Sequence, residues 1–149
     1  MDLKQKTHAR CHKLLNSKIQ ELSAILQSLS ESASKDTKSS AGDKHETARA
    51  MIQIEQEAVG KQLSEVVAQK SVLDKIDPAV TSSQIMKGSL VKTNKGYLFL
   101  SIALGKIAVD KEAVLVISPG SPLGIKLAGL RLDETASVNG TGYKVESIY

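Results

Sequence analysis

The sequence is poor in aromatic residues and in cysteine. It has no Trp, one Phe and three Tyr among 149 residues, so it offers few side chains on which unpaired bases would stack. Its single cysteine, Cys11, excludes an internal disulfide framework and is typical of a reducing compartment. We therefore expect neither a reader of single-stranded RNA or DNA nor a disulfide-stapled fold.

Long apolar runs are absent as well. No window approaches the ~18 apolar residues of a membrane span, and residues 1–6 are polar where a signal peptide would have its apolar core. No P-loop or dinucleotide-binding fingerprint occurs. These absences predict a cytoplasmic protein with no membrane segment.

Charge is unevenly distributed along the chain, whose net charge is +4. Residues 1–29 and 78–149 carry more basic than acidic side chains, whereas residues 30–77 carry more acidic ones. This pattern would orient the molecule on a large nucleoprotein partner, and it is equally typical of a solvated surface.

Apolar residues in the first half recur at the spacing of a coiled coil. Two such seams are present, the first with steps of four or three residues and the second with a seven-residue repeat that has one further apolar residue, Leu63, between its members. They consist of Cys11, Leu15, Ile19, Leu22, Leu26 and Leu29, and of Ile52, Val59, Leu63, Val66 and Leu73.

A helical hairpin would bring these seams together. Serines and Gly42 lower the helix propensity between them, so we expect the chain to reverse within residues 30–45. Asp43 and Glu46 would then lie at the tip. Their spacing is typical of an N-cap with a capping box, and it also places two carboxylates close enough to share a metal ion. The spacing alone leaves both roles open.

The second half has the pattern of a small β domain. Asp77 and Pro78 end the second helix, so we expect a helical hairpin over residues 1–77, a linker over 78–84 and a β domain over 85–149. The predicted class is α+β, with an antiparallel sheet and one short helix. Strands are expected at 90–93, 97–102, 114–117, 135–138 and 143–148, and the helix at 121–128.

A second candidate site lies near the N-terminus. His8, Cys11 and His12 share one predicted helical segment and are the residue types that bind transition metals. Three potential ligands in one segment are also compatible with an ordinary helix start, and the sequence does not decide between the two.

The order of these parts resembles the Gre-type transcript cleavage factors of bacterial RNA polymerase, over roughly residues 11–149. The likeness rests on a tip pattern, on a Ser-Pro segment and on the closing strand over residues 143–149. The matching residues are Gly42, Asp43, Glu46 and Ala48 at the tip, and Ile117, Ser118, Ser121, Pro122, Leu123, Gly124, Leu127, Ala128 and Gly129 in the second half.

The resemblance implies a function that needs no active site of the chain's own. In this family the coiled coil enters the secondary channel of RNA polymerase, and a C-terminal domain of FKBP-like topology docks near the channel mouth. Asp43 and Glu46 would help hold the second magnesium ion of the polymerase and position water, so that the polymerase cleaves backtracked RNA. Ser121 and Pro122 would belong to the docking surface, or simply begin a helix. Contact with nascent RNA would be indirect, and the protein would be a monomer.

The tip also departs from the family pattern, and several alternatives follow. Thr47, Arg49 and Ala50 replace an Asn, an acidic residue and an aromatic one, and Lys44 and His45 add positive charge. A less negative tip would hold the second metal less well, which favours a polymerase regulator without cleavage activity. A peptidyl-prolyl isomerase and a coiled-coil adaptor that pairs its seams between chains are the remaining candidates.

Overall fold

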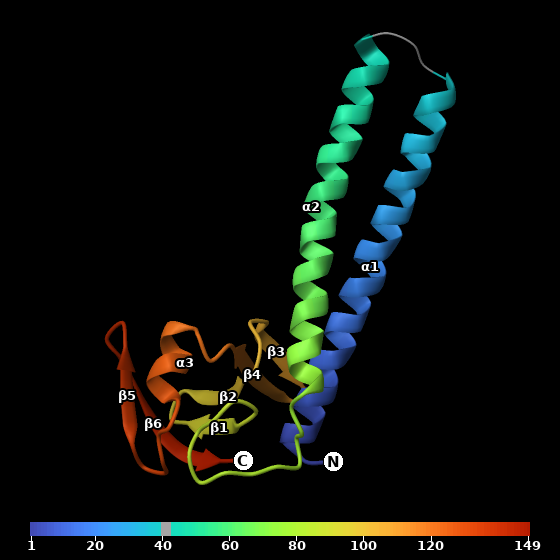
Figure 1. Ribbon diagram of the computed structural model, residues 1–149. Coiled ribbons are helices and arrows are strands. Elements are labelled where there is room, and N and C mark those ends of the chain that lie inside the picture. Colours follow the sequence, from blue (N-terminus) through green and yellow to red (C-terminus); the bar gives the residue numbers. More distant parts are fainter. Residues whose placement is uncertain (40–42) are drawn as a thin grey trace. The chain divides into compact units, whose positions relative to one another are not determined.

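Two long helices form the first half of the chain (Figure 1). The computed structural model describes residues 1–39 and 43–149, with the side chains of 36–45 excepted. Helix α1 (Leu3–Ser39) has 37 residues and helix α2 (Asp43–Asp74) has 32. At ~1.5 Å per residue these helices are about 55 and 48 Å long. The two helices run antiparallel, as the heptad pattern predicted.

A capping box that the sequence analysis missed begins α1. The Asp2 carboxylate accepts a hydrogen bond from the backbone N of Gln5 at 2.8 Å, and the Gln5 side-chain oxygen accepts one from the backbone N of Asp2 at 3.1 Å. This reciprocal pair satisfies amide groups that have no partner inside the helix.

The predicted seams are the buried stripes of the two helices. Cys11, Leu15 and Leu22 are buried on α1, as are Val59 and Leu73 on α2, and the other described seam residues are half-buried. Helix α1 continues through its serines to Ser39, since serine is only modestly worse than alanine in a helix interior. The end of α1 at Ser39 and the start of α2 at Asp43 both lie inside the range predicted for the reversal, and residues 40–42 lie outside the described residues.

A six-stranded sheet forms the second half, in the order β3-β4-β2-β1-β6-β5. The short helix α3 (Pro122–Leu127) lies between β4 and β5 in the chain. The strands are β1 (Leu90–Thr93), β2 (Gly96–Leu100), β3 (Gly105–Val109), β4 (Glu112–Ile117), β5 (Thr135–Val138) and β6 (Thr141–Ile148).

The sheet is mixed, which refines the antiparallel sheet expected from the sequence. Neighbouring strands pair antiparallel except β2 and β4, which run parallel with Tyr97 opposite Val114. The cause is β3, a strand that the sequence analysis did not predict. It pairs with the far side of β4 and turns at Asp110, whose φ is 54°, so β4 returns beside β2 in the same direction.

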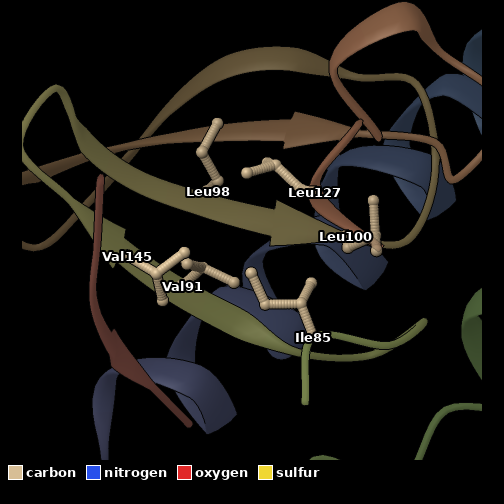
Figure 2. Packing of buried hydrophobic residues seen from close by; sticks show 6 residues of the cluster. All are labelled: Ile85, Val91, Leu98, Leu100, Leu127 and Val145. Carbon is tan, nitrogen blue, oxygen red and sulfur yellow. The ribbon is translucent and has the colours of Figure 1, made fainter. Parts of the chain in front are cut away.

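Apolar side chains from the sheet, from α3 and from the segment before β1 form the core of the second half. Figure 2 shows these side chains converging from different parts of the chain. None is more than 4 % exposed, so each contributes the ~1.5–3 kcal/mol expected for a fully buried aliphatic side chain. They are Ile85, Val91, Leu98, Leu100, Leu127 and Val145.

The chain forms two compact units. One is Leu14–Ala68, and the other combines Met1–Lys13 with Gln69–Tyr149. Within the second unit the Lys6 ammonium lies 2.8 Å from the Asp110 carboxylate, and the Gln69 side chain donates to the carbonyl of Ala103 at 3.0 Å. The helices described, over 3–39, 43–74 and 122–127, include none long and apolar enough to cross a membrane.

Candidate functional site

The start of α2 contains the two tip carboxylates. Asp43 is the first residue of the helix, and Glu46 follows three positions later, so both lie on the same side of its first turn. The Glu46 side chain is exposed. The side chains of Asp43, Lys44 and His45 lie outside the described residues, and the capping role predicted for Asp43 lies there with them.

The turn that follows is open to solvent. Thr47, Arg49 and Ala50, which depart from the Gre-type tip pattern, are all exposed. Arg49 is three residues from Glu46, which puts a cationic side chain beside an anionic one on the helix surface. A cation there disfavours a second cation at the carboxylate.

Met51 and Ile54, two apolar residues in the first half of α2, were not singled out from the sequence. Met51 and Ile54 are each 67 % exposed, and both lie off the heptad seam of α2. Glu46, Ala50 and Ile54 follow one another at steps of four, so they share one face of the helix. This face, Glu46–Ala50–Ile54, carries a carboxylate at one end and an apolar side chain at the other.

Ser121 is the N-cap of α3, and Pro122 follows it in the first turn. The Ser121 hydroxyl accepts a hydrogen bond from the backbone N of Gly124 at 3.0 Å and donates one to the carbonyl of Ser118 at 2.7 Å. The helix-start interpretation is therefore confirmed. Ser121 is half-buried, whereas Pro122 is exposed, so Pro122 is the more accessible member of the predicted docking pair.

Gly124, in the same segment, has no room for a side chain. A Cβ added to Gly124 would lie 2.2 Å from the Ser118 carbonyl oxygen, far inside van der Waals contact. The resemblance of this segment to the Gre-type pattern thus has, in part, a local structural cause. The loop closes tightly over the first turn of α3.

The three potential metal ligands near the N-terminus do not form a metal site. Across the described residues, no three His, Cys, Asp or Glu side chains are grouped so that they could hold an ion. His8 Nε2 donates to the carbonyl of Leu73 at 3.0 Å, and Cys11 is fully buried. Burial raises the pKa of the Cys11 thiol to about 11, so the thiolate that metals bind is scarce at neutral pH.

His12 instead belongs to a contact between the two helices. Its Nε2 lies 3.4 Å from a carboxylate oxygen of Asp74, and its ring meets the His8 ring edge-on with centroids 4.8 Å apart. Burial lowers the pKa of His12, and the neighbouring His8 lowers it further, while Asp74 acts in the opposite direction.

No family model matches the chain, and no curated protein matches it closely enough to be called similar.

Proposed function

We propose that this chain is a Gre-like transcription elongation factor of the cytoplasm. In this proposal it binds RNA polymerase as a monomer, inserts its helical hairpin into the secondary channel and stimulates the polymerase's own cleavage of backtracked RNA. The observation that carries the proposal is the position of Asp43 and Glu46 in the first turn of α2, directly after the reversal of a two-helix hairpin.

The chemistry assigns the chain a supporting role in a reaction that the polymerase carries out. Magnesium needs six oxygen ligands in near-octahedral geometry, and two tip carboxylates supply only part of that set. The remaining ligands would come from the polymerase and from water. A carboxylate that completes the shell of a weakly held second ion helps to generate and orient the attacking water, so the chain need not be an enzyme by itself.

The face Glu46–Ala50–Ile54 supports delivery of these carboxylates. Ile54 lies two helical turns from Glu46, about 12 Å along the axis, and its side chain is 67 % exposed. An exposed aliphatic side chain behind the acidic turn would pack against the wall of a channel and fix the depth to which the tip enters. Pro122, exposed at the start of α3, would contact the polymerase separately.

The deciding experiment is RNA cleavage in a backtracked elongation complex, across a magnesium titration, with the wild type and with Asp43→Asn and Glu46→Gln. Cleavage should fall at least ten-fold in each variant, because each loses a charged metal ligand, and polymerase binding should stay within two-fold. Glu57→Gln is the matched control, since it removes an exposed carboxylate of the same helix away from the tip. Equal cleavage by the wild type and by both tip variants would refute the proposal.

Arg49 favours a second candidate, a secondary-channel regulator that occupies the polymerase without promoting cleavage. Its exposed side chain adds positive charge one turn from Glu46. The same assay separates the two functions, because the regulator would compete with an active cleavage factor for polymerase and shorten no RNA. If the chain binds no polymerase and its solution mass is that of a dimer, the coiled-coil adaptor replaces both.

A further inference from the structure

Lys4, in the first turn of α1, is unusually buried for a lysine. Its side chain is 4 % exposed, and lysines buried to this degree are normally paired with a carboxylate. Its Nζ donates a hydrogen bond to the carbonyl of Val80 at 2.5 Å. Among the described side chains, no carboxylate lies within ion-pair distance of it. The ammonium group thus retains a buried positive charge and two further N–H donors.

A cavity of about 140 Å³ is lined in part by Lys4. Its lining residues include Lys4, Lys87, Ser82 and Ser89, and we call it the Lys4 cavity. Its volume is close to that of an engineered cavity that holds benzene, so it accommodates a group of about six heavy atoms. All of its lining residues belong to the compact unit that contains the sheet.

The polar groups in the wall are mainly donors. The Ser89 hydroxyl oxygen accepts from the backbone N of Met86 at 3.0 Å, and that of Ser82 accepts from the backbone N of Gln84 at 3.2 Å. Each hydroxyl keeps its own proton to donate. Two lysines and two serines are therefore among the residues that line the space.

One carboxylate, that of Asp77, also lines the cavity. It accepts a hydrogen bond from the backbone N of Ala79 at 2.9 Å. Burial lowers the pKa of Lys4, while Asp2 and Asp77 act in the opposite direction. These two carboxylates offset part of the cost of burying the ammonium, without giving it a direct ionic contact.

We propose that the Lys4 cavity binds a small oxyanion, a phosphate or carboxylate group of a small molecule, between the ammonium groups of Lys4 and Lys87. The anion supplies the counter-ion that Lys4 lacks. Buried charge-assisted hydrogen bonds are stronger than neutral ones, and the cost of desolvating Lys4 has already been met in folding. The hydroxyls of Ser82 and Ser89 then donate to the remaining oxygens.

The test is a titration of the full chain with inorganic phosphate at constant ionic strength, followed by the backbone amide resonances of Gly88 and Ser89. We expect saturable shifts at both amides. Lys4→Met should weaken the affinity about 10- to 100-fold, the effect of removing a hydrogen bond to a charged group. Lys87→Met should weaken it by a smaller factor. Lys111→Met is the control, because it removes an exposed lysine that does not line the Lys4 cavity.

The possible results distinguish anion binding by Lys4 from a purely structural role of this lysine. If Lys4 only tethers the carbonyl of Val80, phosphate produces no saturable shift in the wild type, and the proposal is overturned. Should Lys4→Met fail to fold, equal phosphate affinity of Lys87→Met and Lys111→Met overturns it as well. Parallel titrations with acetate and glycerol 3-phosphate define the ligand, since saturation by acetate indicates a carboxylate and tighter binding of glycerol 3-phosphate indicates a phosphate ester.

Discussion

Replacing Gly124 with alanine should destabilise the sheet unit, because backbone atoms occupy the space that the new methyl group would need. The Cβ would lie 2.2 Å from the Ser118 carbonyl oxygen, 2.9 Å from Ser121 Oγ and 3.1 Å from the carbonyl carbon of Pro119. Two of these three atoms are main-chain atoms, so no rotamer change relieves the overlap. The loop has to open, and the Ser121 cap is lost with it.

The magnitude follows from these two losses. Overpacking a well-packed site typically costs 1–3 kcal/mol, and loss of a serine N-cap costs about 1 kcal/mol. We expect Gly124→Ala to lower the free energy of unfolding by about 2–4 kcal/mol. With a urea m-value of about 1–3 kcal/mol per molar, a loss of 3 kcal/mol lowers the midpoint by at least about 1 M.

Tyrosine fluorescence during urea unfolding is the suitable assay. Tyr97, Tyr143 and Tyr149 all belong to the sheet unit, and no tryptophan obscures their signal. Tyrosine fluorescence therefore reports the unfolding of that unit alone. Far-ultraviolet circular dichroism follows the loss of helical structure in the other unit. Two coincident transitions would show that the units unfold together.

Gly120→Ala is the matched control in the same loop. A Cβ at Gly120 meets no atom within 4 Å and its φ is not positive, so the change should stay within about 0.5 kcal/mol. Ser121→Ala, which removes the cap without adding bulk, should cost about 1 kcal/mol. If Gly124→Ala is as stable as the wild type, or if Gly120→Ala is equally destabilised, the steric argument is refuted.

Three further predictions concern the helices. Leu73→Ala, at a fully buried seam position, should lower the free energy of unfolding by about 2–5 kcal/mol. Val67→Ala, at a half-exposed position, should lower it by less than about 1 kcal/mol. Thermal unfolding of the two variants at comparable temperatures would contradict the burial of the seam. The Cys11 thiol, with its pKa raised to about 11, should react with a thiol reagent at pH 8 only after urea unfolds the chain, and rapid modification of the native protein would exclude the burial described. The folded-state pKa of His12 lies below its ordinary 6.5, so the unfolded chain binds more protons than the folded one. The free energy of unfolding should therefore fall as the pH drops from 7.5 to 5.5. Urea midpoints should show a smaller fall in His12→Gln.

Features recorded in local sequence patterns were predictable. The seams followed from heptad spacing, and the start of α3 followed from Ser121 and Pro122. Strand β3 was missed although Ile107 and Val109 alternate with Lys106 and Ala108, a pattern typical of a half-buried strand. The parallel pairing of β2 with β4 depends on which strands become neighbours, and short-range patterns do not carry that information.

In the candidate sites too, contacts between residues close in sequence could be predicted, whereas contacts that depend on tertiary packing could not. The cap at Ser121 is a contact between residues close in sequence, and it was expected. The hydrogen bond from His8 to the carbonyl of Leu73 joins residues 65 positions apart, so the sequence left the metal interpretation open until the fold excluded it. The burial of Lys4 is likewise a result of tertiary packing, and no spacing rule indicates it.

The order of strands has a consequence for synthesis on the ribosome. Strand β1, the first of the sheet in the chain, lies between β2 and β6, and Val91 pairs with Ile148. Until Ile148 has left the exit tunnel, β1 has one neighbour and a free row of main-chain donors and acceptors, the type of edge that recruits other strands. A nascent chain paused after α3 should therefore need chaperone protection that the completed sheet does not.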